Sequence, residues 1–201
     1  MIKSKETLTR GFCLTVLAAA FVYGLVLPFM WGNDPLSETG TLSLLCEDRK
    51  AFFWLWGVLT SGSIIMNTRL LYRRYSYRNR LFDALCIIAF ISVCCVALTL
   101  GHSIADWNPK RILHWVATGI YIVLTVAPIL LFFIVNRRRH KSFKLFAIIT
   151  VMIFLSFVFI FVFVGKSALM EMVPVALIEL FLFVLNFIIP AKKPIELRTA
   201  K

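Results

Sequence analysis

The chain has 201 residues, of which 60% are hydrophobic and only 16% are charged, and its mean hydropathy is +0.87. A soluble domain cannot bury that much apolar surface, so the composition predicts an integral membrane protein. The formal net charge of +12 does not indicate nucleic-acid binding, because the basic residues lie in short clusters between hydrophobic segments, as in the cytoplasmic loops of membrane proteins.

Six hydrophobic segments follow one another along the chain, each long enough to cross a hydrocarbon core of about 30 Å. The first follows Lys3, Lys5 and Arg10, but it ends in the letters PFMW rather than at a small-residue cleavage site. We therefore interpret it as a retained span and not as a signal peptide. The six predicted spans cover about residues 12–31, 51–71, 81–100, 112–135, 145–164 and 173–189.

The second span carries Thr60, Ser63 and Asn67 at a spacing that places them on one helical face. We interpret this face as a helix-packing surface rather than as a ligand surface. The fifth span ends in the run FLSFVFIFVFVG, which is apolar nearly all round and predicts an outer helix whose second half faces lipid.

The fourth span is the most regular of the polar-faced segments. Asn108 followed by Pro109 is a good cap and first residue for the helix that begins there. Within this span, polar side chains recur at i, i+4, i+7 and i+11, which makes one continuous face: His114, Thr118, Tyr121 and Thr125.

The predicted site lies at the external ends of the third and fourth spans. These spans are consecutive and antiparallel, so we expect them to be neighbours whose polar faces meet inside the bundle. The candidate catalytic residues are His102, Asp106 and His114. Glu179 of the sixth span would lie about 9 Å below the same surface, given the helical rise. The predicted ligand pocket consists of Glu179, Thr118, Tyr121, Glu38 and Ser37.

Structural roles are the alternatives for these residues. His114 would then bond a neighbouring carbonyl or threonine, and Glu179 would be a protonated carboxyl that bonds across helices. We predict no metal and no cofactor, because the sequence lacks HExxH and HxxxH. Zinc held by the His102–Asp106 pair and His114 remains an alternative. A nucleophile at Ser37 or Ser103 is another, although no GxSxG motif is present.

The distribution of basic residues predicts the orientation. Most Lys and Arg residues fall at the two termini and in the loops after the second and fourth spans. By the positive-inside rule both termini are cytoplasmic. The sequence thus predicts an all-α, multi-pass bundle of six transmembrane helices in the cell membrane, with residues 1–201 forming a single domain.

Three features carry a resemblance to a known family: the loop NDPLSETG (33–40) after the first span, Asp106 before the fourth, and HWVAT (114–118) in its first turns. In this layout the chain resembles bacterial six-span membrane proteins of unknown function that are distantly related to the DRAM-type and GPI-remodelling lipid proteins. The resemblance extends from about residue 12 to residue 190. It implies a lipid-related role at the outer leaflet, with Asp106 and His114 near the site.

Lipid binding or lipid modification at the outer leaflet is therefore the predicted function, with membrane lipids as partners and no nucleic acid. His114 would act as a base or headgroup ligand, Asp106 would orient a histidine, and Glu179 would tune the pocket. One alternative is transport of a small solute or proton with Glu179 and His114 as relay groups, although Asn67 and Asn186 are the only polar steps towards the cytoplasm. Another is a non-enzymatic membrane scaffold. Whether the protein is an enzyme, and its oligomeric state, are left open by the sequence.

Overall fold

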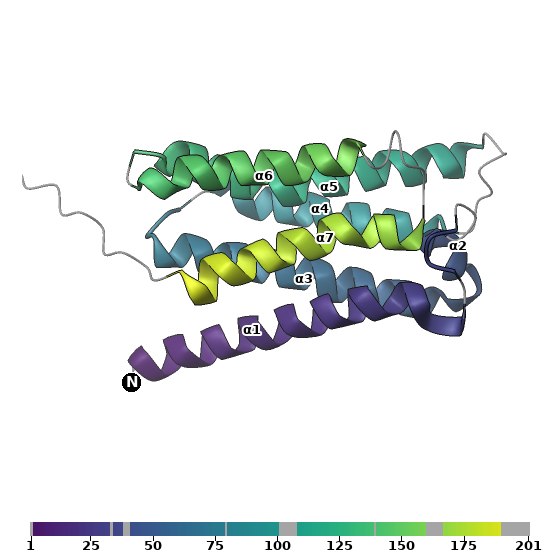
Figure 1. Cartoon of the computed structure of the whole chain (residues 1–201), viewed down its shortest axis with the longest axis horizontal. Coiled ribbons are helices and arrows are strands. Elements are labelled where there is room, and N and C mark those ends of the chain that lie inside the picture. The colour runs from purple at the N-terminus through teal and green to yellow at the C-terminus, as the bar shows by residue number, and fades with distance from the viewer. Residues whose placement is uncertain are drawn as a thin grey trace, which may run out of the picture.

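The computed structural model describes residues 2–32, 34–37, 41–78, 80–100, 108–138, 140–159 and 167–189. These residues form helices and no strand, and the long helices lie roughly parallel or antiparallel in a bundle (Figure 1). The elements in chain order are α1 (Ile2–Val26), η1 (Leu27–Gly32), α2 (Leu42–Leu45), η2 (Glu47–Arg49), α3 (Lys50–Arg74), α4 (Arg80–Leu98), α5 (Pro109–Asn136), α6 (Lys141–Phe159), α7 (Ala168–Phe183) and the π-helical turn η4 (Val184–Ile188).

The six long helices follow the six predicted segments, and their boundaries differ most at the start. α1 begins at Ile2, about ten residues before the predicted span, because the charged N-terminal stretch continues the same helix. Four stretches are long and apolar enough to cross a membrane, so the coarse prediction of a helical membrane protein is supported. These stretches are Glu6–Met30, Arg80–Leu98, Pro109–Asn136 and Glu171–Ile188.

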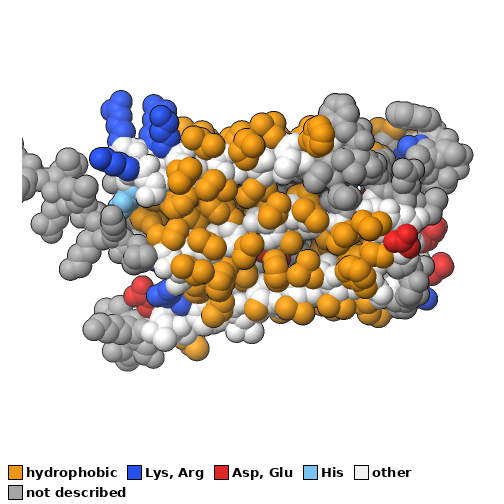
Figure 2. Space-filling model, in the orientation of Figure 1, with side chains coloured by type: hydrophobic (Ala, Val, Ile, Leu, Met, Phe, Trp, Pro, Cys, Tyr) orange, Lys and Arg blue, Asp and Glu red, His pale blue; other side chains and the backbone are white. Residues whose placement is uncertain are grey.

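The face of the bundle that Figure 2 shows is apolar along most of its length. Large hydrophobic side chains that point outwards are common on every long helix, including Val22 on α1, Ile87 on α4, Val123 on α5 and Met152 on α6. In water such a surface would be unstable, whereas lipid tails solvate it. On α6, the exposure of Leu155, Val158 and Phe159 agrees with the predicted lipid-facing surface.

Charged side chains gather at the two ends of the bundle (Figure 2). We call the end that holds the N-terminus of α1 the Arg-rich end, and the opposite end the acidic end. The described Lys and Arg side chains of the Arg-rich end are Arg10, Arg69, Arg73, Arg74, Arg78, Arg80, Arg137, Arg138, Lys141 and Lys144. The described acids of the acidic end are Asp34, Glu47, Asp48 and Glu171.

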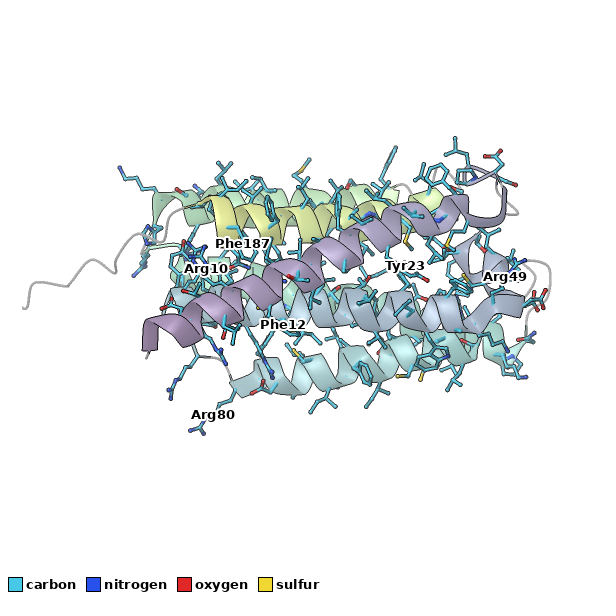
Figure 3. All side chains as sticks on the ribbon, turned by 90° about the horizontal axis from the view of Figure 1, so that it is seen from below. Arg10, Phe12, Tyr23, Arg49, Arg80 and Phe187 are labelled. Carbon is cyan, nitrogen blue, oxygen red and sulfur yellow. The ribbon has the colours of Figure 1, made fainter. Side chains whose placement is uncertain are left out.

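α3 occupies the middle of the bundle and packs against α1, α4, α5 and α7. It is also the long helix with the most buried polar side chains, and the predicted face of Thr60, Ser63 and Asn67 is fully buried. α1 crosses over α3 and α7 (Figure 3). Near the acidic end the Tyr23 hydroxyl donates to the carbonyl oxygen of Phe52 over 3.1 Å, which links α1 to α3. The most polar helix is thus the one best shielded from lipid.

Aromatic side chains fill the core at the Arg-rich end. Phe132, Phe133 and Phe143 are fully buried and touch one another with ring centroids 5.2–5.5 Å apart. Tyr72 stacks on Phe132 at 5.4 Å. Edge and tilted contacts of this kind add to the burial of apolar area, so this cluster fixes how α3, α5 and α6 meet.

Two local predictions are confirmed. The Asn108 side chain accepts a hydrogen bond from the Arg111 amide at 2.9 Å, and Pro109 occupies the first turn of α5. α4 and α5 are the most extensively packed helix pair of the bundle, as expected for consecutive antiparallel helices. Both features orient the polar face of α5 towards the interior.

Candidate functional site

A cavity of about 110 Å³ lies inside the half of the bundle near the acidic end. It separates α5 from α7, which make few direct contacts with each other. Most of its wall is apolar and comes from α3, α4, α5, α6 and α7, including Trp56, Val96 and Met172. The polar residues that line it are Ser43, His114, Thr118, Tyr121, Thr125 and Glu171.

The polar wall of the cavity is the predicted face of α5. His114 Nδ1 lies 3.2 Å from the hydroxyl of Thr99, the residue after α4, and that hydroxyl is also 2.7 Å from the carbonyl oxygen of Cys95. If the hydroxyl proton is donated to Cys95, the His114 ring donates from Nδ1, and in its neutral form Nε2 is then an acceptor. One turn further on, the Thr118 hydroxyl donates to the His114 carbonyl at 2.8 Å. The α4–α5 contact therefore fixes the orientation of the imidazole ring.

Tyr121 forms the deeper part of the same wall. It is buried, and its hydroxyl accepts a hydrogen bond from Ser61 of α3 at 3.2 Å. Below it the cavity is bounded by Thr125, Val126 and Ile178. The ionisable side chains His114 and Glu171 thus line the cavity near the acidic end, whereas Thr125, Val126 and Ile178 bound it at mid-bundle.

The short helix α2 covers the acidic end of the cavity. The Leu42 amide donates to Glu171 Oε2 at 3.0 Å, and the Leu169 amide donates to the carbonyl oxygen of Pro35 at 3.1 Å. Because the amides at the start of a helix lack partners within it, a carboxylate there is stabilising. Glu171 thereby ties the loop between α1 and α3 to the start of α7, and it also lines the cavity.

Cys46 ends α2 and is fully buried beneath this cover. Burial raises the pKa of its thiol to about 11, the negative charge of Glu171 contributes in the same direction, and Arg49 opposes both. The thiol is therefore protonated at neutral pH and a poor nucleophile.

Glu179 lies beside the cavity but not in its wall. Its neighbour Ile178 lines the cavity, whereas Glu179 is on the side of α7 that packs on α3, where Ser63 interacts with its carboxyl group. The carboxyl is 1% exposed, and its Oε1 atom has no hydrogen-bond partner among the described residues. The structure thus brings His114, Thr118 and Tyr121 to one cavity and places Glu179 at a separate interface.

The remaining predicted residues are not in the cavity wall or lie outside the described residues. Ser37 belongs to a turn in which its amide donates to the carbonyl oxygen of Asp34 at 3.2 Å. His102, Asp106 and Glu38 lie outside the described residues. Their assignment to a site stays a prediction.

No three His, Cys, Asp or Glu side chains converge within the described ranges in a way that would hold a metal ion. The alternative of a zinc site uses His102 and Asp106, which those ranges do not include. Of the proposed ligands only His114 is described, and its Nδ1 faces Thr99.

Two residues of the site were not singled out from the sequence, Ser43 and Glu171. In the sequence, Glu171 is one of several acids predicted to be external. Its function as the acceptor for the Leu42 amide, far away in sequence, is visible only in the structure. A signal did exist in its position, because an acid in the first turn of a helix favours the helix dipole. That signal does not reveal which second segment the acid binds.

Comparison of the chain with protein-family models, with curated proteins and with solved structures finds no match. The argument for function therefore rests on the cavity and on the residues around it.

Proposed function

We propose that this protein spans the cell membrane six times with both termini in the cytoplasm, and that it binds a lipid at the outer leaflet. The orientation is supported by the concentration of Arg and Lys at one end of the bundle, since such residues mark the cytoplasmic side. The acidic end, with α2 above the cavity, is then external. α3 and α6 count as the other two spans in this proposal. The polar face of α3 is buried by its neighbours, and α6 exposes large apolar side chains such as Leu155 and Val158.

The cavity between α5 and α7 is the observation that carries the lipid proposal. An engineered cavity of about 150 Å³ lined by apolar side chains is known to bind benzene. A cavity of about 110 Å³ is of similar size, and accommodates part of an acyl chain rather than a whole lipid. Its polar groups, which include Ser43, His114 and Glu171, lie near the external end. This position of the ionisable side chains suits an amphiphile whose acyl chain lies deep in the cavity and whose polar head lies near the surface.

Binding, and not chemical modification, is the activity proposed. His114 supplies a hydrogen-bonding group for the lipid head, with Thr99 fixing its ring. Thr118 and Tyr121 supply further polar contacts along the wall. A catalytic role would need His102 and Asp106, whose assignment remains a prediction from the sequence.

Fluorescence quenching tests the proposal, because Trp56 lines the cavity and is buried. In a variant that keeps Trp56 as its single tryptophan, lipids with brominated acyl chains should quench its emission when a chain enters the cavity. Val175→Phe fills the cavity from α7 and should abolish this quenching. Leu180→Phe, on the same helix but 47% exposed and outside the cavity wall, should leave it unchanged.

A second filling variant, Thr118→Leu on α5, guards against a folding defect specific to Val175→Phe. Melting temperatures of all variants are measured in the same nanodiscs. Equal quenching in the filled variants and in Leu180→Phe would show that no chain occupies the cavity, and the lipid-binding proposal would be wrong.

A further inference from the structure

The interface of α3 with α1 and α7 contains several buried polar atoms that lack hydrogen-bond partners. Natural proteins leave few such atoms, and each calls for an explanation such as a bound water, ion or proton. Within a membrane the expectation is stronger, because no bulk water is at hand. Five of the buried polar atoms without a partner among the described residues are Thr60 Oγ1, Ser63 Oγ, Asn67 Oδ1, Glu179 Oε1 and Asn186 Oδ1. We call these five residues the polar interface.

Glu179 is the ionisable member of the polar interface. The Ser63 hydroxyl lies close to its carboxyl group, but Ser63 Oγ and Glu179 Oε1 both lack a hydrogen-bond partner among the described residues. No ion pair of Glu179 with a described basic side chain is present. An ionised carboxylate is costly to bury without a positive partner. The carboxyl must therefore be neutralised by a group that enters from elsewhere, either a proton or a metal cation.

Polar side chains lie between this carboxyl and the Arg-rich end. Asn67 lies one turn from Ser63, and its Nδ2 donates to the Ser63 carbonyl at 2.9 Å and to the Cys13 carbonyl at 3.2 Å. Asn186 Nδ2 donates to the Asn67 carbonyl at 2.8 Å. Both asparagine side chains are fully buried. Asn67 and Asn186 therefore place polar groups between Glu179 and the Arg-rich end of the bundle.

The π-helical turn η4 completes this connection. Arg10 Nη2 donates to the Asn186 carbonyl at 3.2 Å, and Arg74 donates to the carbonyls of Leu185 at 2.5 Å and Ile189 at 2.8 Å. Arg10 also lies over the Phe187 ring, 5.8 Å from its centroid (Figure 3). π-helical turns are frequent at functional sites, because they leave carbonyls outside the regular ladder.

The same contacts favour a proton over a metal cation. The guanidinium groups of Arg10 and Arg74 stand at the entry, and their positive charge repels a divalent metal ion twice as strongly as a proton. A proton can pass along waters that polar side chains hold in place, by exchange of hydrogen bonds. A hard cation such as Ca²⁺ takes six to eight oxygen ligands, which is more than the five unpartnered oxygens of the polar interface.

Other titratable side chains lie on the helices that pack against α3 and α7. Those that the structure describes are Glu6, Arg10, Cys13 and Tyr23 on α1, Lys50, Arg69, Tyr72, Arg73 and Arg74 on α3, Arg80, Asp83, Cys86, Cys94 and Cys95 on α4, Lys110, Arg111, His114 and Tyr121 on α5, Lys141 and Lys144 on α6, and Glu171 on α7. The Lys and Arg side chains among them lie towards the two ends of the bundle.

We propose that Glu179, together with Ser63, is a proton-binding site inside the bundle, and that it exchanges its proton with the Arg-rich end through Asn67 and Asn186. This site is separate from the lipid cavity and does not depend on the lipid proposal. The two sites are nevertheless neighbours, because Ile178 lines the cavity and Glu179 is the next residue of α7.

The hydrophobic reagent dicyclohexylcarbodiimide tests this proposal, because it adds to a carboxyl that carries a proton and leaves a stable acylurea that mass spectrometry locates. We expect labelling at Glu179 at acidic pH and its loss as the pH rises. Glu179→Gln removes the labelling site. Thr150→Val is the matched control, since Thr150 is a buried hydroxyl on α6 that bonds within its own helix at 2.8 Å.

Membrane vesicles of known sidedness test the route. A cysteine introduced at position 138 reports whether the Arg-rich end faces the bath. Glu179 labelling should follow the bath pH when that end faces outwards, and should not follow it, within the same time, when it faces inwards. Asn186→Leu should leave labelling at acidic pH intact and slow its loss after the bath is made alkaline.

Three results would overturn the proposal. Protection of Glu179 by Na⁺ at constant pH would make it a metal-cation site. Labelling that follows the bath pH only when the acidic end faces outwards would reverse the route. Absence of labelling in a protein that melts normally would show that the carboxyl holds no proton.

Discussion

The Tyr72 hydroxyl of α3 donates a hydrogen bond to the backbone carbonyl of Pro128 in α5, over 2.7 Å and in a fully buried setting. Pro128 lies inside α5, which continues through it to Asn136. The proline ring removes the amide that would donate to the carbonyl of Leu124, whereas the Tyr72 bond goes to the carbonyl of Pro128 itself. Here the bond also ties the central helix to α5.

Loss of this bond should destabilise the bundle measurably. We expect Tyr72→Phe to lower the free energy of unfolding by about 0.5–1.5 kcal/mol, the range for buried bonds between membrane helices. Thermal melting in nanodiscs measures the effect. Tyr77→Phe is the control, because Tyr77 packs against Tyr72 with ring centroids 4.8 Å apart and its hydroxyl has no hydrogen bond to a described residue. Equal melting of the two variants would contradict the role of the bond.

The aromatic core at the Arg-rich end and the outer face of α6 should respond differently to truncation. Phe143 is 2% exposed and touches several rings, so we expect Phe143→Ala to cost about 3–5 kcal/mol. Phe159, on the same helix, is 58% exposed, and Phe159→Ala should change the melting temperature little. A large loss at Phe159 would mean that another surface covers this part of α6.

The contact between Leu42 and Glu171 should control access to Cys46. In a variant with Cys46 as its single cysteine, we expect slow alkylation at pH 8, because the pKa of about 11 keeps the thiol protonated. The rate should rise as the pH approaches that value. Glu171→Ala removes the acceptor of the Leu42 amide and a negative charge that raises the thiol pKa, so alkylation should become faster.

Glu47→Ala is the matched control for this experiment, because Glu47 is an exposed acid of the same loop. The thiol of Cys46 in the Glu47→Ala variant should be alkylated at the same rate as in the single-cysteine protein that keeps both acids. Identical rates in the Glu171 and Glu47 variants would show that the contact does not hold α2 in place.

The proposed orientation is tested by cysteine labelling in intact cells. Lys110→Cys at the acidic end and Arg138→Cys at the Arg-rich end both place the thiol on an exposed position. An impermeant thiol reagent should label the cysteine at position 110 and spare the one at position 138 until the cells are opened. The reverse pattern would invert the topology.

Short-range signals in the sequence predicted much of this fold. The Asn108–Pro109 pair specifies the start of α5 by local chemistry, and the structure has that cap. The spacing of Thr60, Ser63 and Asn67 specifies a helical face, and all three side chains are buried. Such predictions succeed because both the cause and the effect lie within a few turns of one helix.

The position of Glu179 could be predicted from the sequence only in part. The helical rise gives its depth in α7, and that depth agrees with the neighbouring cavity. Which neighbour it faces depends on the rotation of α7 about its own axis, and that rotation is set by contacts with α1, α3 and α6. The sequence therefore predicted a shared pocket with His114, whereas the structure directs Glu179 towards Ser63.

The polarity of α3 has a consequence for how the protein is made. In the six-span arrangement that we propose, a segment with Thr60, Ser63 and Asn67 at mid-membrane partitions poorly from the translocation channel into lipid when it is alone. α1 precedes α3 during synthesis, and its Cys13 carbonyl accepts a hydrogen bond from the Asn67 side chain. α7 and the turn η4 that follows it are synthesised last, and the Asn186 side chain of η4 donates a hydrogen bond to the Asn67 carbonyl. We therefore expect α3 to stay beside the channel, in contact with α1, until α7 and η4 have been synthesised and cover its remaining polar side.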